Sequence, residues 1–446
     1  MSAAPPSSTA LLTDRYELTM LDAALADGTA GRHCVFEVFT RHLPAGRRYG
    51  VLAGTGRALE AIVAFRFRDQ QLSYLSEHRM VTRATLDYLE RFRFAGSVTG
   101  YAEGECFFPL SPVMVVEGTF AEAVLLETVI LSVLNADSAV ASAASRMTSA
   151  AGERPCLEMG SRRTHEQAAV GAARAAVVAG FAGTSNLEAG RRYGLSTIGT
   201  ASHAFTLLHD HEEEAFASQV AAQGPGTTLL VDTYDVARGV TRAVAAAGPS
   251  LGAVRLDSGD LLSQSREARA QLDALGARGT RIVVTSDLDE HAIAALAAAP
   301  VDAYGVGTSV VTGSGAPTCA MVYKLVAREG ADGVLAPVAK ASTRKTSTGG
   351  RKTAARRLGP DGRAVEEVLV AGPDQAVATW APGVQDLRPL HVPLVARGAV
   401  DTRWTGPTGV QLAVARHAAS RAELPRGALR LSPGEPALPS VTLHLP

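Results

Sequence analysis

Polar and small residues follow a series of short apolar runs between residues 155 and 308, and their types suit the binding of phosphate, sugar and carboxylate groups. Turns favour Gly, Ser, Thr and Asp for structural reasons alone, so any single motif of this kind could be only a turn. Their recurrence after one apolar run after another instead indicates a shared polar surface. The motifs are EMGSRR at 158–163, GTSN at 183–186, GTASH at 199–203, DTYD at 232–235, RLDSGD at 255–260, TSD at 285–287 and GVGT at 305–308.

The motif RLDSGD carries the most specific chemistry of the set. Arg255 can hold a carboxylate through two parallel hydrogen bonds, and Asp257 is suited to binding sugar hydroxyls. Gly259 permits close approach of the backbone to a ligand. The alternative is an Arg–Asp ion pair that only caps the helix expected to follow from Leu261.

His203 is the candidate reactive histidine, because it closes a run of small residues. It could act as an acid or base, a metal ligand, a phosphoryl acceptor or a packed core residue. In GVGT, backbone N–H groups and the hydroxyl of Thr308 could surround a phosphate. The sequence contains no Walker A motif, GxGxxG fingerprint or GxSxG elbow. The residues by themselves therefore predict a phosphate- and sugar-binding enzyme of α/β class.

The elements that must position these residues are parallel strands joined by helices. Ala-rich helical stretches alternate with the apolar runs, and such alternation predicts crossover connections. The spacing is uneven, which favours an irregular parallel β/α barrel over a regular eightfold one. Ligands of such folds bind at the carboxyl ends of the strands, which we place near Met159, Thr184, Gly199, Asp232, Leu256, Thr285 and Val306.

The segments on either side of this barrel lack its regular alternation of apolar runs and Ala-rich helical stretches. We divide the chain into an N-terminal mixed α/β domain (1–134), the barrel with the active site (135–325) and a C-terminal segment (326–446). The barrel is expected to pack against a mixed α+β domain formed by the N-terminal segment and part of the C-terminal one. The expected elements are helices over Asp14–Asp22, Leu59–Ala64, Thr85–Phe92 and Ala121–Leu134, a strand over Val35–Phe39, a basic mobile loop over Ser342–Arg357, and strand-like runs over Val365–Ala376 and Leu387–Val400.

Composition excludes several classes of protein. Among 446 residues, Lys and Arg number 43 and Asp and Glu 44, so the basic excess of a nucleic-acid-binding protein is missing. No uninterrupted apolar run reaches the length of a membrane span, about 18 residues. The cysteines lack CxxC spacing and Met1–Thr9 lacks the features of a signal peptide, so we expect a cytoplasmic protein without a disulfide framework or zinc ribbon. We expect no metal held by protein side chains alone.

Taken in order, the motifs resemble those of the nicotinate phosphoribosyltransferases. The resemblance covers most of the chain and is weak only in the C-terminal quarter. It rests on LLTDRYELTM at 11–20, FEVFTRHLP at 36–44, EMGSRRTHEQAA at 158–169, GTSN at 183–186, GTASHAF at 199–205, VDTYD at 231–235, RLDSGDL at 255–261 and YGVGTSVVT at 304–312.

The resemblance implies a reaction and its partners. Such enzymes join nicotinate to phosphoribosyl pyrophosphate, giving nicotinate mononucleotide and pyrophosphate on the route to NAD. ATP hydrolysis is coupled to the step through a phosphohistidine, and Mg²⁺ accompanies the phosphorylated substrates. The family works as a homodimer with shared active sites. The basic loop either closes over pyrophosphate or is a solvated linker.

The resemblance also implies a role for individual residues. The phosphohistidine falls on His203 and its carboxylate partner on Asp232, while Asp257 would bind the ribose hydroxyls and Arg255 the nicotinate carboxylate. Tyr16 would stack on the pyridine ring, reaching across the dimer interface. The remaining site residues would be Met159 and Ser185 near the pyridine ring, Arg162, Ser286, Gly305, Gly307 and Thr308 around phosphates, and Arg41 at the pyrophosphate.

Ser185 bears on the choice between the acid and its amide. Related nicotinamide-using enzymes resemble this chain but carry an acidic residue at the matching place, which would repel nicotinate. Two departures from the family pattern are Met159, where an aromatic residue is common, and Ala204, where a polar residue is common. The alternatives are a nicotinamide or quinolinate phosphoribosyltransferase, or a catalytically silent paralogue that binds related metabolites.

Overall fold

A computed structural model describes residues 8–340, 348–380, 383 and 386–445 of the chain. The chain forms two compact units. The central unit comprises Ala143–Gly315, and the flanking unit combines the chain up to Ser142 with the chain from Ala316 onward. The N-terminal and C-terminal segments therefore build one mixed unit together, as expected from the sequence.

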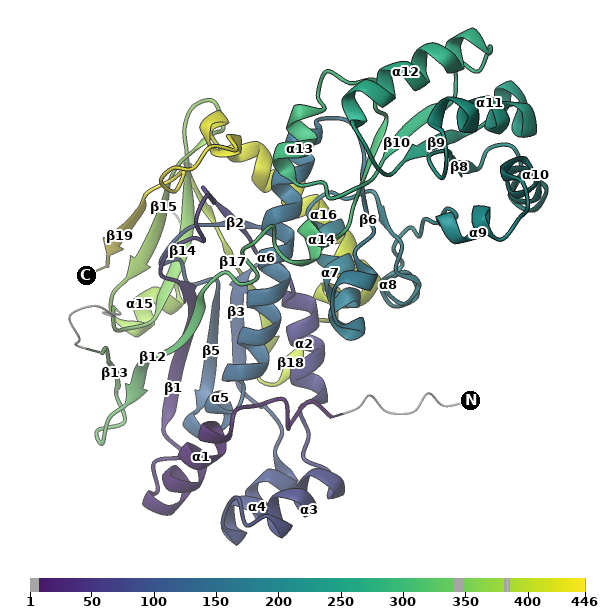
Figure 1. Cartoon of the computed structure of the whole chain (residues 1–446). Helices are drawn as coiled ribbons and strands as arrows, with labels where there is room; N and C mark the ends of the chain where they lie inside the picture. The colour runs from purple at the N-terminus through teal and green to yellow at the C-terminus, as the bar shows by residue number, and fades with distance from the viewer. Residues whose placement is uncertain (1–7, 341–347, 381–382, 384–385, 446) are drawn as a thin grey trace. The chain divides into compact units, whose positions relative to one another are not determined.

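The central unit contains a parallel sheet that curls into a half-barrel (Figure 1). In the described part of the chain the sheet has six strands in the order β7-β6-β11-β10-β9-β8. The strands are β6 (Cys156–Glu158), β7 (Gly183–Thr184), β8 (Thr228–Leu230), β9 (Ala253–Leu256), β10 (Arg281–Val284) and β11 (Ala303–Val306). Their helices are α7 (Glu166–Val178), α8 (Leu187–Tyr193), α9 (His203–Leu207), α10 (Glu212–Gln223), α11 (Val236–Ala247), α12 (Leu261–Ala274), α13 (Glu290–Ala295) and α14 (Thr308–Val311). The expected irregular β/α architecture is confirmed.

Short polar side chains start the helices that follow the strands. Asp235 accepts a hydrogen bond from the backbone N–H of Arg238 (2.8 Å) and caps α11. Asp260 accepts from Leu262 and Ser263 (3.1 and 3.2 Å) and caps α12. Such caps stabilise a helix by about 1 kcal/mol each. The second aspartate of each motif, Asp235 or Asp260, therefore has a structural role. The first, Asp232 or Asp257, does not cap a helix and remains available to the site.

One expected strand end, near Gly199, is wrong. Residues around it form a single bridge, Thr184 to Thr197, and no strand. The backbone of Thr184 exchanges hydrogen bonds with Ser196 and Ile198 (3.0 and 2.9 Å). Pairing stops there because its partner β7 is only two residues long.

The flanking unit is built on an antiparallel sheet, with seven strands among the described residues in the order β13-β12-β1-β5-β3-β17-β18. Its strands are β1 (His33–Thr40), β3 (Ser97–Tyr101), β5 (Met114–Thr119), β12 (Met321–Glu329), β13 (Leu335–Pro337), β17 (His391–Ala396) and β18 (Ala399–Val400). Helices α1 (Arg15–Asp27), α2 (Thr55–Ala64), α3 (Asp69–Glu77), α4 (Arg83–Arg91), α5 (Phe120–Val124) and the start of α6 (Glu127–Ala151) contribute to its main apolar core. In this core the rings of Phe36 and Tyr323 stack at 4.8 Å between centroids.

A smaller sheet completes the flanking unit, with the order β16-β14-β15-β19. Its strands are β14 (Lys352–Leu358), β15 (Ala364–Ala371), β16 (Leu387–Pro389) and β19 (Ser440–His444). The short pair β2 (Gly50–Val51) and β4 (Cys106–Phe107), the helices α15 (Asp374–Ala378) and α16 (Gly406–Glu423), and short 3-10 turns account for the rest.

The single helix expected over Ala121–Leu134 is wrong, because the structure divides it into α5 and α6. Thr119 caps α5 through a capping box with Glu122. The buried carboxylate of Glu17 then accepts hydrogen bonds from the backbone N–H (2.9 Å) and hydroxyl (2.5 Å) of Thr128 at the start of α6. A helix start with its own buried acceptor is stable at this point, so the apolar run breaks there.

The prediction of a basic loop over Ser342–Arg357 is also wrong for its last part, from Lys352 onward. Residues 342–347 lie outside the described residues, whereas β14 begins at Lys352. The ammonium group of Lys352 pairs with the fully buried carboxylate of Glu37 (2.8 Å), whose other oxygen accepts the Lys352 backbone N–H (2.8 Å). This ion pair holds the basic segment in a strand instead of leaving it in solvent.

Helix α6 is long and apolar enough, by length and composition alone, to cross a membrane. However, 67% of its most apolar window is buried inside the protein, as in the core helix of a soluble protein. Its first turns belong to the apolar core of the flanking unit.

A buried cluster of charges ties the smaller sheet to α16. The guanidinium of Arg356 is fully buried and pairs with Glu105 (2.8 Å) and Glu367 (3.1 Å). Burial alone would raise the pKa of Glu105, but Arg356 and Arg388 outweigh it and lower this pKa to about 2. The carboxylate thus remains charged inside the protein because its partners are charged.

We expect Arg356→Met to lower the free energy of unfolding by about 3–5 kcal/mol, because it leaves the buried carboxylate of Glu367 without its cation and removes one of the arginines around Glu105. Urea denaturation at neutral pH measures the loss. Arg357→Met is the matched control: Arg357, the next residue on β14, forms only the surface pairs with Glu366 and Asp386 within the described part of the chain, worth at most about 1 kcal/mol. Equal losses in the two variants would contradict the role given to Arg356.

Candidate active site

The strand-end residues predicted to do chemistry lie mostly in the central unit. Only two predicted site residues, Tyr16 and Arg41, belong to the flanking unit. The central unit holds Met159, Arg162, Ser185, His203, Asp232, Arg255, Asp257, Ser286, Gly305, Gly307 and Thr308. Because the strands are parallel, their carboxyl ends meet at one edge of the sheet, and the polar motifs meet with them.

Arg255 lies on β9 with only 12% of its side chain exposed. One terminal nitrogen, Nη1, donates to the hydroxyl of Thr200 and to the carbonyl of Ala201 (3.2 Å). The other, Nη2, lies 3.8 Å from Asp257, and Nε has no hydrogen-bond partner among the described residues. Burial lowers the pKa of Arg255 against the opposing effect of Asp257 and Asp232, yet a guanidinium stays charged. A guanidinium that is fixed in place, charged and not fully hydrogen-bonded is suited to binding an anionic ligand.

Asp257 is held on several sides at the end of β9. Its Oδ1 accepts a hydrogen bond from the hydroxyl of Thr285, which follows β10. Its backbone N–H donates to Oδ2 of Asp232 (2.7 Å), and that same oxygen accepts from the hydroxyl of Ser258 (3.0 Å). Asp232 therefore fixes the backbone that carries Asp257.

His203 opens helix α9 with its imidazole about two-fifths exposed. Nδ1 lies 3.1 Å from the hydroxyl of Thr233, and Nε2 lies 3.7 Å from Oδ2 of Asp257. The expectation from the sequence paired His203 with Asp232. In the described structure Oδ2 of Asp232 bonds to the 257–258 backbone and side chain, and its Oδ1 has no partner. The carboxylate that lies beside the imidazole is Asp257, while Oδ2 of Asp232 is bonded to the chain that follows β9.

The glycines of GVGT have packing reasons as well as chemical ones. A Cβ on Gly305, inside β11, would meet Thr285 at 2.4 Å and the sulfur of Met159 at 2.8 Å. Gly307 follows the strand and precedes the short helix α14, which begins at Thr308. The absence of a side chain at Gly305 lets Met159 pack across the strand ends.

Ser286 adopts a backbone conformation that side chains rarely occupy, with φ of 140°. Its carbonyl accepts a hydrogen bond from the backbone N–H of Leu288 (2.8 Å), and its side chain is exposed. A non-glycine residue in such a conformation costs about 1–3 kcal/mol, and strain of this kind clusters at functional sites.

Hydroxyl groups complete the site, and reasoning from the sequence missed them. Thr200, Thr233 and Thr285 each hold a charged or ionisable side chain in place. All three lie inside the strand-end motifs GTASH, DTYD and TSD. The strand-end motifs could have identified these threonines, but the prediction from the sequence assigned roles to the charged side chains and not to the neutral hydroxyls beside them.

The two predicted site residues of the flanking unit are available to a ligand. Tyr16 lies on α1 with 44% of its surface exposed. Partial burial, together with the charges of Glu127 and Glu17, raises the pKa of Tyr16 to about 12, so its ring stays neutral. Arg41 directly follows β1, and its buried Nε finds no hydrogen-bond partner in the described part of the chain.

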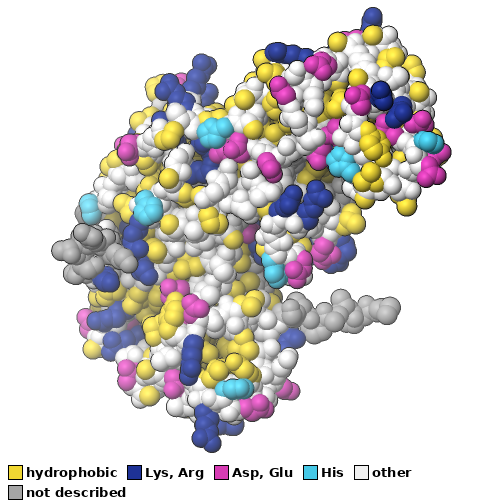
Figure 2. Space-filling model, in the orientation of Figure 1, with side chains coloured by type: hydrophobic (Ala, Val, Ile, Leu, Met, Phe, Trp, Pro, Cys, Tyr) yellow, Lys and Arg dark blue, Asp and Glu magenta, His cyan; other side chains and the backbone are white. Residues whose placement is uncertain are grey.

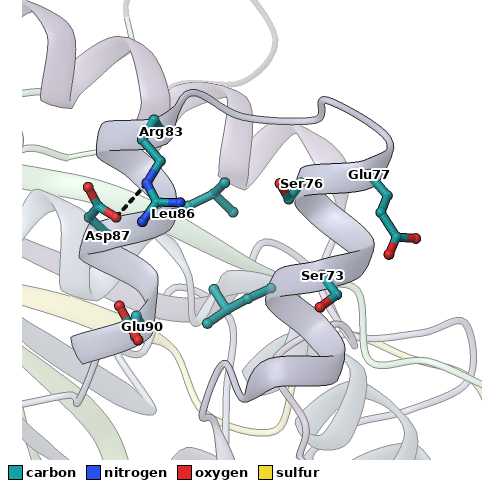
Figure 3. Close-up of a pocket in the computed structure, with 8 residues that line it drawn as sticks. Ser73, Ser76, Glu77, Arg83, Leu86, Asp87 and Glu90 are labelled. Carbon is teal, nitrogen blue, oxygen red and sulfur yellow. Dashed lines mark ion pairs between the residues drawn. The ribbon is translucent and has the colours of Figure 1, made fainter.

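Two cavities are lined by none of the predicted site residues. One, of about 300 Å³, separates α3 from α4 and is lined by Leu72, Ser73, Ser76, Glu77, Arg83, Leu86, Asp87 and Glu90 (Figure 3). The other, of about 310 Å³, lies along α11 and α12. The described residues contain no group of three or more His, Cys, Asp or Glu side chains placed to hold a metal ion. On the face shown in Figure 2, basic side chains are interspersed with acidic ones.

Comparison with known proteins was made against families, individual sequences and solved structures. Residues 11–135 match the nicotinate phosphoribosyltransferase N-terminal domain family. A nicotinate phosphoribosyltransferase of Mycobacterium tuberculosis is 56% identical over 446 residues, covering 97% of this chain and 95% of that protein. The Bacillus subtilis protein of the same name is 37% identical over 381 residues, covering 83% and 77%. The crystal structure of human nicotinic acid phosphoribosyltransferase superposes with a TM-score of 0.79 at 25% identity, covering 95% of this chain and 96% of that one.

We expect Ser286→Gly to raise the free energy of unfolding by about 1 kcal/mol, since relief of the strain at φ 140° exceeds the extra flexibility of the unfolded chain. Thermal and urea unfolding measure the change. Ser286→Ala is the control, because it removes the same hydroxyl but keeps the strained backbone. A glycine variant no more stable than the alanine variant would refute the strain.

Proposed function

The chain belongs to the nicotinate phosphoribosyltransferase family, and we propose that its central unit joins nicotinate to phosphoribosyl pyrophosphate with the side chains described above. The products are nicotinate mononucleotide and pyrophosphate. The observation that carries the proposal is the buried, fixed guanidinium of Arg255 beside Asp257 and His203 at the strand ends.

Arg255 supplies the recognition of the acid. Its position is set by Thr200 and Ala201, which bind Nη1 and leave Nη2 to donate to a carboxylate. A charge-assisted hydrogen bond of this kind contributes about 1.5–3 kcal/mol. Ser185 presents a neutral hydroxyl to the same ligand, so no carboxylate repels nicotinate there.

The reaction is a displacement at the anomeric carbon of the ribose. The bond from that carbon to the pyrophosphate oxygen breaks as the bond to the pyridine nitrogen forms, and the leaving oxygen keeps the electron pair. Positive charge grows on the ribose, and the carboxylate of Asp257, which holds the ribose hydroxyls, lies where it stabilises that charge. Arg162, Ser286 and the 305–308 segment bind the phosphates, so positioning supplies much of the rate.

ATP coupling is the second part of the proposal. The γ-phosphoryl group of ATP passes to a ring nitrogen of His203, ADP leaves, and the N–P bond is hydrolysed during the cycle. Thr233 and Asp257 approach the imidazole from its two nitrogens and hold its plane. The carboxylate of Asp257 stabilises the positive charge that a phosphorylated ring carries.

The residues also fit the Mg²⁺ that accompanies phosphorylated substrates. Mg²⁺ is usually held by one or two carboxylates together with substrate phosphates and water. The free Oδ1 of Asp232, which lacks a partner among the described residues, is an oxygen of this type near Asp257. Bound Mg²⁺ would neutralise the charge on the leaving pyrophosphate.

A homodimer with shared sites is supported by the surface of α1. Tyr16 and Met20 lie four residues apart on α1 and are 44% and 36% exposed. Residues four apart lie on one face of a helix, so the two form an apolar patch that a second copy can cover. In this arrangement Tyr16 of one copy stacks on the pyridine ring bound by the other.

We place the enzyme in the cytoplasm, where its four free, buried cysteines remain reduced.

We expect Arg255→Lys to raise the KM for nicotinate about tenfold to a hundredfold, because an ammonium group cannot make the two-point contact. We expect turnover of nicotinamide to be slow in the wild type and not to fall further in the variant, since the amide does not use the charge. Arg269→Lys is the control, as Arg269 likewise binds backbone carbonyls but on α12 at Ala277 and Thr280. Equal use of acid and amide by the wild type would overturn the assignment.

We expect ATP to stimulate product formation in the wild type and to have no effect on His203→Ala, which lacks the phosphoryl acceptor. The assay follows nicotinate mononucleotide with Mg²⁺, with and without ATP. His209→Ala serves as the control, because among the described residues this neighbouring histidine bonds only to the carbonyl of Phe205 in its own turn. Synthesis indifferent to ATP in every variant would keep the transferase and discard the phosphohistidine.

A further inference from the structure

A closed ring of hydrogen bonds lies beneath the edge of the site, and none of the roles assigned above uses it. It starts at Glu158, the last residue of β6, and Thr184, the last residue of β7. These two residues are register partners on neighbouring strands, and both side chains are fully buried. The hydroxyl of Thr184 donates to Oε2 of Glu158.

The ring continues into the two loops that leave these strands. The backbone N–H of Gly160 donates to Oε1 of Glu158 (2.5 Å). The backbone N–H of Asn186 donates to the hydroxyl oxygen of Thr184 (2.9 Å). The side-chain amide of Asn186 then donates to the hydroxyl of Ser161 (3.0 Å), which closes the ring across both loops.

At the buried positions of Glu158 and Thr184, a pair of apolar side chains would stabilise the fold as much as the polar pair does. Burial raises the pKa of Glu158, against the hydrogen bonds from Thr184 and Gly160. A buried carboxylate is costly, and replacing buried polar groups with apolar ones is often neutral or stabilising. The polar groups add geometric specificity, because each hydrogen bond fixes the distance and orientation of a loop relative to the strand ends.

Packing leaves the first loop little freedom to settle elsewhere. A Cβ on Gly160 would meet Val311 at 2.2 Å and the carbonyl of Gly307 at 2.8 Å, so the turn lies directly against α14 and the residue before it. The first loop carries Met159 and Arg162, and the second carries Ser185, whose N–H donates to the carbonyl of Glu158 (2.8 Å). The ring therefore joins the two loops that carry these ligand-facing residues of the proposed function.

We propose that the ring of Glu158, Gly160, Ser161, Thr184 and Asn186 is a positioning device that sets the spacing between Met159 and Ser185, and thereby the preference for nicotinate over nicotinamide. This inference rests on the proposed function, because it takes Met159 and Ser185 as the residues that contact the pyridine ring. Thr184 and Glu158 are positioning residues, since neither reaches the ligand itself.

The test is Thr184→Val, which keeps the shape of the side chain and removes the hydroxyl that joins two bonds of the ring. We expect the KM for nicotinate to rise about tenfold, the value of one buried hydrogen bond, with kcat within about threefold. The kcat/KM ratio of nicotinate to nicotinamide should fall by a similar factor. Thr184→Ser should restore both values, because it returns the hydroxyl.

Thr280→Val is the matched control. Thr280 is equally buried, and its hydroxyl donates to the carbonyl of Leu251 (2.9 Å) at the opposite, amino-terminal ends of the strands. It should lose comparable thermal stability and keep the wild-type KM and substrate preference. If Thr184→Val does not fold, Ser161→Ala removes one acceptor from a half-buried position and should raise the KM for nicotinate about threefold.

Wild-type KM and substrate preference in both Thr184→Val and Ser161→Ala would overturn the inference. Arg255→Lys separates this outcome from failure of the proposed function. If Arg255→Lys raises the KM for nicotinate while the ring variants do not, the ligand site stands and the ring is only structural. If Arg255→Lys also leaves the KM unchanged, the ligand site itself is misplaced.

Discussion

The hydrogen bond from the backbone N–H of Asp257 to Oδ2 of Asp232 joins the ends of β8 and β9, and the rest of the site depends on it. It orients the Asp257 carboxylate so that one oxygen accepts from Thr285 and the other faces His203. Arg255, two residues earlier on β9, then lies on the other side of that carboxylate. A shift of β9 relative to its neighbours would move Arg255 and Asp257 away from Asp232, Thr285 and His203 together, because the two residues lie on or directly after β9.

The polar residues at the strand ends divide into two kinds. Asp235, Asp260 and Asn186 cap helices α11, α12 and α8, so they hold the elements in place. Asp232 and Asp257, in the same motifs, hold one another and the cationic groups of the site. A cap makes a local bond to the following turn, whereas a site residue contacts a neighbouring strand. The chemistry of a parallel sheet therefore depends on which member of each motif is free of its own helix.

Buried charge has a different role in the flanking unit. Arg356 and Lys352 on β14 each meet carboxylates that are almost wholly buried, which converts a basic sequence expected to be a loop into a strand. Sequence alone could not show this, because Glu37 and Glu105 are some 250 or more residues away along the chain. The division of the 121–134 helix likewise depends on Glu17, which lies more than a hundred residues before Thr128. Local periodicity reports neither kind of contact.

The sequence by itself determined the alternation of strands and helices, the strand ends except the one near Gly199, and the residue types that meet there, because apolar period and turn chemistry are local properties. Its motifs also determined the family. The tertiary structure alone decided the partners within the site: Asp257 and not Asp232 beside His203, and the hydroxyls of Thr200, Thr233 and Thr285 as supports. The contact between Thr285 and Asp257 depends on the order and register of β10 and β9, whereas Thr200 and His203 reach the site from α9 and the segment before it, so side chains 28 to 55 residues apart meet. No local pattern encodes such distances, since they arise only when the sheet is assembled.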